Sequence, residues 1–247
     1  MIRVGTMGWS YPFWVGSFYP KGLPPGGFLR EYARHFTTVE VDSTFYRIPY
    51  DSVIRGWDEG TPDGFVFAAK FPRKISYDKR LQNVGGEAAL FVERMEGLGK
   101  KLGPLLLQLP SDFGANEKAA LEGFLDALPE GHRYVVEAKG KHPPAEILVP
   151  MLEGRKVGLA AVDSPQVPLV EALTSDFFYV RLEGDRFRVK GTTGRVEVDR
   201  ESDLVRWSSM LREMDARAVD VYVYCGKRYS GHSAHDALRL KGLLSTA

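Results

Sequence analysis

Two carboxylates alternate with two valines in the segment TTVEVDSTFYR, residues 37–47. Val39 and Val41 share one parity, and Glu40 and Asp42 share the other. Because successive side chains of a β-strand point to opposite faces, this spacing predicts a strand with valines on one face and carboxylates on the other. Carboxylates held close to cations are suited to general acid–base chemistry, so this strand is the first candidate for a reactive site.

Polar residues of one parity also end the other short apolar runs, from the second predicted strand to the eighth. If the strands form a barrel, one parity packs on the helices outside it. The other parity faces the interior and becomes polar at the carboxyl end, where active sites of this fold lie. A structural ion-pair network inside the barrel would give the same pattern. The predicted inward-facing set is Glu40, Asp42, Lys70, Gln108, Glu137, Lys139, Asp163, Arg181, Glu183, Tyr222 and Tyr224.

The predicted roles follow from residue type. Carboxylates are the candidate acids and bases, and cations would bind a phosphate or carboxylate group of a substrate. The candidate catalytic residues are Glu40, Asp42, Glu137 and Asp163. The candidate substrate-binding residues are Trp9, Tyr11, Tyr46, Lys70, Arg73, Gln108, Lys139, Arg181, Tyr224 and Lys227.

Eight apolar segments supply the strands that would position these residues. They alternate with segments of helical spacing or composition, including VPLVEAL at 167–173, which predicts parallel strands with crossover helices. Eight such units predict a TIM-type (β/α)8 barrel. An open doubly wound sheet is the alternative, but the GxGxxG and GxxxxGK[ST] fingerprints of such sheets are absent. The predicted strands are 2–7, 38–43, 65–70, 105–109, 134–138, 157–162, 177–182 and 221–225.

Two connections are longer than the barrel requires. Residues 8–27, GWSYPFWVGSFYPKGLPPGG, are rich in aromatic residues, and a loop of this length is typical of a lid or binding loop. The same aromatic residues would also serve as a satellite core over one end of the barrel. Residues 184–200 have the pattern of a small hairpin excursion after the seventh strand.

Basic residues gather in two predicted loops. The segment KFPRKISYDKRL starts at the end of the third strand, and CGKRYSGHSAHDA follows the eighth. The second segment offers glycines, two basic residues and a capping box at 233–236, which suits phosphate binding at a helix N-terminus. An ordinary loop and helix cap would have the same sequence.

Length and composition are typical of one barrel domain spanning residues 1–247, since the chain is 44% hydrophobic. Its 33 basic and 32 acidic residues give a net charge of +1, so any nucleic-acid or membrane contact would depend on a local patch. The single Cys225, the absence of a signal segment and the lack of a long apolar run predict a soluble, cytoplasmic protein that is not bound to membranes. The sequence does not define the oligomeric state.

Metal and nucleophile chemistry have little support in the sequence. Of five histidines, His142 and His232 are the two expected near the barrel mouth, and HExxH or Cys–His spacing is absent. Cys225 has the outward parity, and there is no GxSxG motif. We therefore predict neither a metal nor a cofactor.

Several longer motifs resemble a known family. They are GTMGWSYPFWVGSFYP, FLREYARHFTTVEVDSTFYRIP, TPDGFVFAAKFPRKI with KRL, LGPLLLQLP, AVDSP, YVRLEG and YVYCGKRYSGHSAHDA. In their order and spacing they are similar to the YecE-like family, number seventy-two among the domains of unknown function, over nearly the entire chain. The resemblance implies a TIM-type barrel and no established activity. Family members carry Glu-Phe-Arg-His where this chain has EAKG at 137–140, a His in place of Tyr77, and an Asn pair near 226–227.

Two functional hypotheses fit these observations. The first is an enzyme that acts on a small phosphorylated or otherwise anionic metabolite, using carboxylate acid–base chemistry at the mouth and a lysine–arginine clamp. The second is a nucleic-acid-binding or nucleic-acid-processing protein, in which the aromatic first loop stacks bases and the basic loops follow phosphates. A pure scaffold would explain the fold but not the polar mouth.

Overall fold

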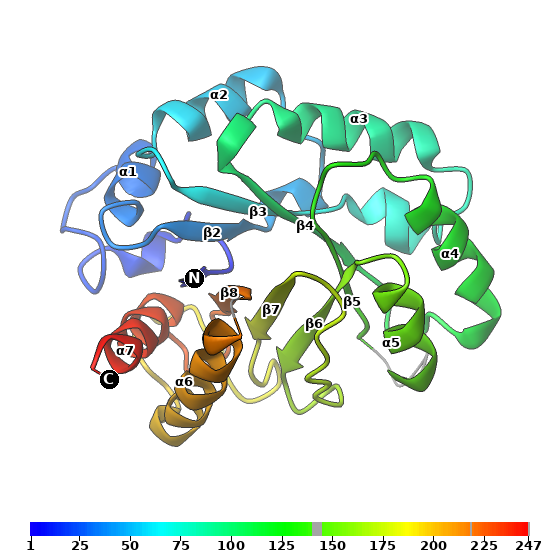
Figure 1. Ribbon diagram of the computed structural model, residues 1–247. Helices are drawn as coiled ribbons and strands as arrows, with labels where there is room; N and C mark the ends of the chain where they lie inside the picture. The colour runs from blue at the N-terminus through cyan, green and yellow to red at the C-terminus, as the bar shows by residue number, and fades with distance from the viewer. Residues whose placement is uncertain (140–144, 218, 247) are drawn as a thin grey trace.

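Eight short apolar segments form parallel strands in the computed structural model, which describes residues 1–139, 145–217 and 219–246. The connecting helices lie outside the ring of strands (Figure 1). This arrangement confirms the predicted TIM-type (β/α)8 barrel. The strands are β1 (Ile2–Thr6), β2 (Thr38–Val41), β3 (Val66–Lys70), β4 (Leu102–Gln108), β5 (Tyr134–Glu137), β6 (Gly158–Asp163), β7 (Phe177–Leu182) and β8 (Asp220–Cys225).

Seven α-helices lie in the described residues, and the helix predicted at 167–173 is not among them. That prediction is wrong because the segment is short, so a costly helical nucleus would gain few hydrogen bonds. None of the described helices is long and apolar enough to cross a lipid bilayer. The α-helices are α1 (Phe28–Tyr32), α2 (Asp51–Glu59), α3 (Gly85–Glu96), α4 (Lys118–Asp126), α5 (Ala145–Glu153), α6 (Glu201–Ala216) and α7 (Ser233–Ser245). The shorter turns are η1 (Pro12–Trp14), η2 (Pro25–Gly27), η3 (Ser43–Phe45), η4 (Lys74–Asp78), η5 (Gly99–Lys101) and η6 (Ala115–Glu117).

The strands follow one another around the barrel in the order β1-β8-β7-β6-β5-β4-β3-β2. Ladders of parallel hydrogen bonds join neighbours along this series. Between β1 and β2 the ring closes through one bridge, which pairs Met7 with Glu40 just beyond the end of β1. The N–H of Gly8 also donates to the carbonyl of Glu40 at 2.8 Å. The barrel is therefore nearly closed, and β1–β2 is its weakest seam.

Tyr32, at the end of α1, strengthens this seam with its side chain. The Tyr32 hydroxyl accepts a hydrogen bond from the N–H of Thr6 at 2.9 Å and donates to the carbonyl of Thr38 at 3.0 Å. At Gly5 the two strands approach so closely that a Cβ atom would lie 2.2 Å from the Thr38 carbonyl oxygen. A phenol hydroxyl thus takes the place of a ladder hydrogen bond between β1 and β2.

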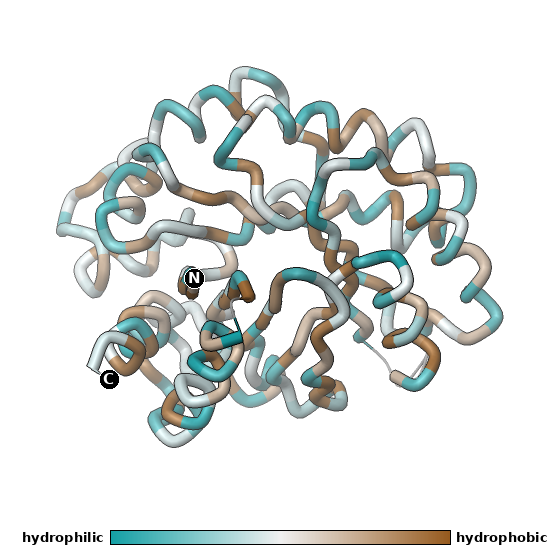
Figure 2. Tube along the Cα trace, viewed as in Figure 1, coloured by the Kyte–Doolittle hydropathy of each residue, from teal (hydrophilic) through white to brown (hydrophobic). Residues whose placement is uncertain are grey.

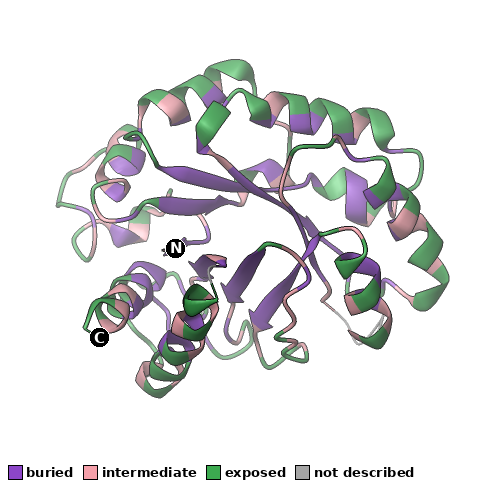
Figure 3. Ribbon diagram, in the orientation of Figure 1, coloured by how far each residue is buried: buried purple, intermediate pink, exposed green. Residues whose placement is uncertain are grey.

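Alternating side chains divide the apolar residues into an inner and an outer layer. The outer layer packs on helices; in α6, Leu204, Trp207 and Leu211 are buried at the spacing of one helix face. Figure 3 shows the strands buried over most of their length and the helices exposed on their outer sides. Figure 2 shows hydrophobic residues following the strands. Inside the barrel lie Met7, Val66, Ala68, Leu106, Val135, Ala160, Val162, Phe177, Tyr179, Tyr222 and Tyr224.

The hairpin predicted at 184–200 is not formed, because this segment contains no strand. The carboxylate of Glu197 instead accepts the backbone N–H groups of Lys190 at 2.8 Å and Gly191 at 3.0 Å. Gly194 has a φ of +69°, and a Cβ atom there would lie 2.2 Å from the carbonyl oxygen of Phe13. Side chain to backbone hydrogen bonds and packing on the first loop therefore replace strand pairing.

The aromatic first loop is largely a satellite core. Trp14 and Tyr19 are buried, with ring centroids 5.6 Å apart, and Tyr19 stacks on Phe28 of α1. The Tyr19 hydroxyl donates to the carbonyl of Trp9 at 2.6 Å. Most of the aromatic surface of this loop is thus used in packing on the barrel, as one of the two interpretations anticipated.

Candidate functional site

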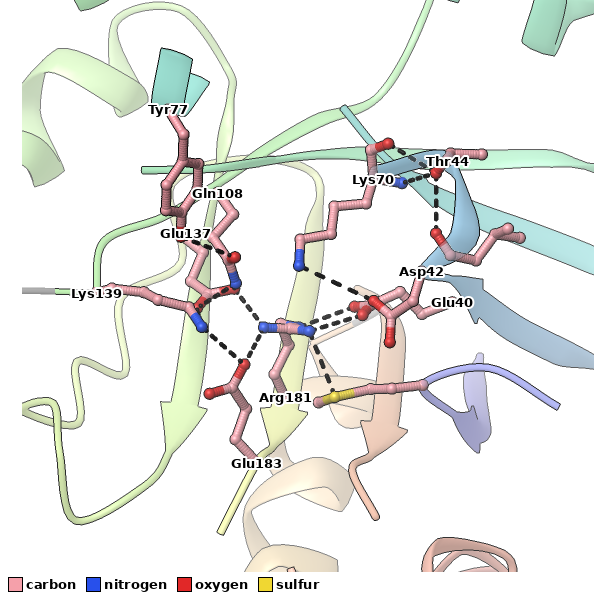
Figure 4. A network of polar contacts seen from close by, with 12 residues as sticks. Glu40, Asp42, Thr44, Lys70, Tyr77, Gln108, Glu137, Lys139, Arg181 and Glu183 are labelled. Carbon is pink, nitrogen blue, oxygen red and sulfur yellow. Dashed lines mark hydrogen bonds and ion pairs between the residues drawn. The ribbon is translucent and has the colours of Figure 1, made fainter. Parts of the chain in front are cut away.

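Arg181 lies at the centre of a buried ion network near the carboxyl ends of the strands (Figure 4). It has the interior parity of β7, two residues after Tyr179. Its Nε donates to Oε2 of Glu40 at 2.9 Å, and its Nη2 donates to Oε1 at 2.8 Å. The Tyr179 hydroxyl adds a third bond to Glu40, at 2.7 Å from Oε2. Both carboxylate oxygens of Glu40 therefore accept hydrogen bonds inside the barrel.

The remaining N–H groups of Arg181 are also engaged. Nη1 donates to Oε2 of Glu137 and to Oε1 of Glu183, and Nη2 contacts the Met7 sulfur at 3.3 Å. A guanidinium has five N–H donors, and each has a partner here. Burial lowers the pKa of Arg181, but Glu137, Glu40 and Glu183 outweigh it and raise the pKa above its usual value. Arg181 consequently stays charged and has no N–H left to clamp a substrate.

Glu137, at the end of β5, is held from a second direction by Gln108 at the end of β4. Nε2 of Gln108 lies 3.0 Å and 2.9 Å from the two carboxylate oxygens of Glu137. The Tyr77 hydroxyl in turn donates to Oε1 of Gln108 at 3.1 Å. Glu40 and Glu137 are both fully buried, so their carboxylates position Arg181 and are shielded from solvent.

Lys139 and Glu183 lie nearer to solvent, with 26% and 25% of their side chains exposed. Nζ of Lys139 is 3.9 Å from Oε1 of Glu137 and 3.7 Å from Oε1 of Glu183, beyond hydrogen-bond distance. Burial raises the pKa of Glu183, but Arg181, Lys139 and Lys70 outweigh it and hold the pKa below its usual value. Among the residues that the structure describes, Lys139 Nζ therefore has no hydrogen-bond partner.

Lys70 and Asp42 form the second partly open pair. Nζ of Lys70 lies 4.0 Å from Oδ1 of Asp42 and 4.3 Å from the centre of the Phe45 ring, while the Lys70 side chain is only 10% exposed. Burial and then Arg181 lower the pKa of Lys70, although Asp42, Glu137 and Glu40 oppose this. Among the described residues, Oδ1 of Asp42 is buried without a hydrogen-bond partner. This pair therefore has unused donors and acceptors where the buried network has none.

The loop after β3 brings Tyr77 to the same end of the barrel. Tyr77 lies in η4, a single π-helical turn, and such turns are frequent at functional sites. Its ring packs edge-on against Phe45 at 5.4 Å. Burial, followed by Glu137 and Glu183, raises the pKa of Tyr77 to about 12. Arg80 and Leu81, which follow η4, have positive φ angles, a strained conformation for residues with branched or long side chains.

The structure therefore brings together most of the predicted inward-facing residues. Seven of the candidate residues share one cluster, in which Phe45 and Tyr77 connect Lys70 to Gln108: Glu40, Asp42, Lys70, Gln108, Glu137, Lys139 and Arg181. Of the residues with which this cluster makes contact, Met7, Thr44, Phe45, Tyr77 and Tyr179 were not among the candidates. Tyr179 did carry a signal, because it shares the parity of Arg181.

Asp163 lies outside this cluster, and its predicted inward orientation is wrong. Its Oδ2 accepts a hydrogen bond from Nε1 of Trp207 in α6 at 2.6 Å and from the Tyr229 hydroxyl at 3.2 Å. Ala160 and Val162 of β6 face the interior, so Asp163 has the opposite, outward parity. Because residues 158–162 are all small or apolar, the sequence of this strand did not reveal which parity is inside.

Trp9 also lies away from the cluster. Its ring packs edge-on against Trp57 of α2 at 5.7 Å and against Phe67 at 6.4 Å. Phe67 belongs to the outer layer of β3, so Trp9 packs on the side of the barrel wall that faces the helices, and its substrate-binding role stays a prediction.

The other predicted binding residues differ in how far they are buried. Tyr224 is buried, with its hydroxyl 2.8 Å from Oγ1 of Thr38, and so it supports the barrel from within. Tyr46 is 81% exposed at the rim. Nζ of Lys227 lies 5.6 Å from the centre of the Tyr11 ring. Burial and then Asp42 and Glu40 raise the pKa of Tyr11, which places that phenol near the carboxylates.

The basic run after β3 is neutralised by neighbouring acids. Arg73 pairs with Asp78 at 3.1 Å, and Lys79 pairs with Glu87 at 2.6 Å. Arg80 similarly binds Asp112 and Glu117. Arg73, Lys79 and Arg80 therefore each have an acidic partner, which the run of basic residues in the sequence did not reveal.

The two histidines singled out from the sequence do not add to the cluster. His142 lies outside the described residues. His232 caps α7, where its Nδ1 accepts the N–H of His235 at 3.2 Å, and its Nε2 lies 3.1 Å from Oγ of Ser17. The cap at this helix is thus His232 rather than the predicted Ser233. No group of three His, Cys, Asp or Glu residues in the described ranges is arranged to hold a metal ion.

The fold and the cluster define a (β/α)8 barrel with a buried ion network beneath a partly open lysine–aspartate pair. The chain belongs to the family described as "Protein of unknown function DUF72", whose profile matches residues 3–247. It is 41% identical over 143 residues to the UPF0759 protein YecE of Escherichia coli K12. That match covers 58% of this chain and 49% of the relative, so the matched region spans about half the length of YecE.

Two solved structures share the fold. A DUF72 family protein from Thermotoga maritima aligns over 99% of both chains with a TM-score of 0.86 and 26% identity. One from Enterococcus faecalis covers 100% of this chain and 96% of its own, with a TM-score of 0.79 and 22% identity. Neither description assigns an activity.

Proposed function

We propose that this protein is an enzyme that acts on a small anionic substrate at the carboxyl end of the barrel. Asp42 exchanges a proton with the substrate, and Lys70 and Lys139 bind its carboxylate or phosphate group. The buried ion network lies beneath them and consists of Glu40, Glu137, Gln108 and Arg181. The substrate does not contact this buried network.

The observation that carries the proposal is the contrast between two neighbouring sets of charges. In the buried network, Arg181 uses all its N–H donors, and both carboxylate oxygens of Glu40 and of Glu137 accept hydrogen bonds. In the pair above it, Lys70 and Asp42 are 4.0 Å apart, and Oδ1 of Asp42 has no hydrogen-bond partner among the described residues. Buried polar groups normally have partners, so an unused one beside a cation indicates a place for a ligand.

The exposure of the charged side chains supports the same division of roles. Asp42 is 38% exposed and Lys139 is 26% exposed, whereas Arg181 is 2% exposed. Nζ of Lys70 and Nζ of Lys139 are both farther than 3.5 Å from every carboxylate oxygen in the described part of the chain. These two ammonium groups can therefore bind an incoming anion without breaking a hydrogen bond to any residue in the described ranges.

The nucleic-acid hypothesis has less support. It requires free cations on the loop after β3, but Arg73, Lys79 and Arg80 each have an acidic partner. The aromatic first loop uses Trp14 and Tyr19 for packing, so their faces are not available for base stacking. No observation in the described residues favours this function over the small-molecule enzyme.

Thermal denaturation with a panel of ligands tests the proposal. The panel contains malonate, pyruvate, glycerol 3-phosphate and a single-stranded oligonucleotide. A small anion at about 100 times its Kd should stabilise the folded chain by about 2.7 kcal/mol and raise the Tm. Lys70→Gln and Lys139→Gln should each reduce this shift, while Lys74→Gln should keep it, because Lys74 lies on the surface, paired with Glu87. A shift with the oligonucleotide and none with the small anions would contradict the proposal.

A further inference from the structure

We propose that Lys70 is an amine nucleophile that forms an imine with its substrate, which is therefore a small aldehyde or ketone bearing an acidic group. This inference rests on the proposed function and names the substrate class for the same site. Lys139 would bind the acidic group while Lys70 reacts at the carbonyl carbon.

The position of the Lys70 amine favours this chemistry. Lys70 ends β3, and its Nζ points toward the carboxylate of Asp42 (Figure 4). The same Nζ lies 4.3 Å from the centre of the Phe45 ring. Arg181 is the cation that most strongly opposes its charge, and Asp42, Glu137 and Glu40 are the acids that favour it. A lysine in a partly apolar pocket beside another cation is a recognised form of activated nucleophile, since only the neutral amine has a free electron pair.

The main chain of Lys70 is fixed by Thr44 of η3. Oγ1 of Thr44 lies 2.7 Å from the Lys70 carbonyl oxygen and accepts the Lys70 N–H at 3.2 Å. The same residue follows Asp42 by two positions, so one turn of chain positions both the amine and the carboxylate. A nucleophile and an acid–base group are thus held together on rigid elements, as catalysis requires.

Comparison with Lys101 shows that burial alone does not explain this environment. Lys101 is buried to a similar extent, but its Nζ donates to the carbonyl oxygens of Asp58 at 2.6 Å and Thr61 at 2.9 Å. Nζ of Lys70 has no hydrogen bond to any described residue. Lys101 is therefore a structural lysine and the matched control for Lys70.

The proposed step requires no oxidant or reductant. The electron pair of Nζ forms a bond to the carbonyl carbon, and the π electrons of C=O move to the oxygen, which takes a proton from Asp42. Nζ then loses a proton to the Asp42 carboxylate, giving a neutral carbinolamine. Asp42 returns that proton to the hydroxyl group, which leaves as water while the C=N bond forms. The nitrogen keeps one proton, so the product is a protonated imine. Because Asp42 takes its first proton from the Lys70 ammonium group, the net change is ammonium plus carbonyl to protonated imine plus water, and the Asp42 carboxylate is regenerated.

Reductive trapping tests the inference on the folded chain. The protein is incubated with pyruvate, glyceraldehyde 3-phosphate or neutral glycolaldehyde in the presence of cyanoborohydride, and the modified lysine is identified by peptide mass spectrometry. We expect at least one acidic carbonyl compound to modify Lys70 about tenfold faster than any other lysine. Lys70→Arg should abolish this modification, Lys101→Arg should leave it unchanged, and Asp42→Asn should slow it.

Two outcomes would overturn the inference. The first is equal labelling of all lysines, as in the urea-unfolded chain. The second is the absence of selective labelling at Lys70 with all three compounds. If malonate still raises the Tm in the second case, the anion site stands and only the imine step fails. If malonate and the carbonyl compounds all leave the Tm unchanged, the proposed function fails as well. Labelling is measured in the wild-type chain, so the test does not depend on the folding of a variant.

Discussion

Arg181 binds Glu40 through two parallel hydrogen bonds across the barrel interior, at 2.9 Å from Nε to Oε2 and 2.8 Å from Nη2 to Oε1. The two residues are 141 positions apart in the chain, on β7 and β2. Such a two-point contact fixes the plane of the guanidinium as well as its position. The contact therefore determines where Glu137 and Glu183 must lie to satisfy the remaining N–H groups.

The first prediction concerns the stability that depends on Arg181. Arg181→Met leaves Glu40 and Glu137 buried without their main partner, so the free energy of unfolding should fall by about 3–5 kcal/mol. Urea denaturation measures the change. Arg73→Met is the control, since Arg73 is 59% exposed in its pair with Asp78 and its loss should cost less than about 1 kcal/mol. Equal effects of the two variants would contradict a structural role for the network.

A second prediction separates Asp42 from Glu137. Asp42→Asn should cost less than about 1 kcal/mol in stability, because Asp42 makes no close ion pair, yet it should abolish turnover of any substrate found. Glu137→Gln places an NH2 group against Gln108 and Arg181, so it should destabilise the fold by about 3 kcal/mol.

Urea denaturation and turnover assays of both variants provide the comparison. If Glu137→Gln folds normally and loses turnover while Asp42→Asn remains active, the acid–base role belongs to Glu137 and our assignment to Asp42 is wrong.

The third prediction is the titration of Lys70. Because burial and Arg181 lower its pKa, the unfolded chain binds more protons than the folded chain between the folded pKa and the usual lysine value. The unfavourable contribution of Lys70 to folding should therefore diminish as pH rises through this window. NMR of lysine labelled with carbon-13 at Cε, assigned with Lys70→Arg, follows the titration directly. Asp42→Asn should move the midpoint still lower, since Asp42 favours the charged amine, and an upward movement would refute the pairing of these residues.

The fourth prediction concerns the seam between β1 and β2. Tyr32→Phe removes the hydroxyl that bonds both Thr6 and Thr38, and it should lower the free energy of unfolding by about 1–3 kcal/mol. Hydrogen exchange at the Thr6 amide should accelerate more than exchange in β4. Tyr50→Phe, at an exposed phenol, is the control and should have no measurable effect. Unchanged exchange at Thr6 in Tyr32→Phe would mean that the seam is closed by other contacts.

Strand identity and most of the interior parity could be predicted from the sequence, because a two-residue period is local. Glu40 and Arg181 face inward as the alternation indicated. Asp163 was misplaced because β6 is apolar on both faces, so its alternation carries no information. The helix expected at 167–173 did not form because the segment is too short, although its composition favours a helix.

What the sequence could not show is the assignment of partners. Arg181 was expected to clamp a substrate, but three carboxylates and a sulfur atom from four separate segments use its donors. The cations after β3 suggested a positive surface, and acids distant in the chain neutralise them. Tyr32 gave no signal at all, because a phenol that bridges two strands looks like any aromatic residue in a helix.

The order of strands around the barrel also shapes how the chain folds. Every neighbouring pair but β1–β8 joins consecutive strands, whereas Ile2 of β1 pairs with Val221 of β8. Closing the loop between Ile2 and Val221, instead of a loop of about 30 residues, adds about 2 kcal/mol to the entropic cost of loop closure. The ring can therefore assemble by local steps until a last, distant encounter between its first and eighth strands. Glu40 loses its contact with water opposite Arg181 when the two strands meet. The ion pair at the centre of the site therefore stabilises only the closed barrel.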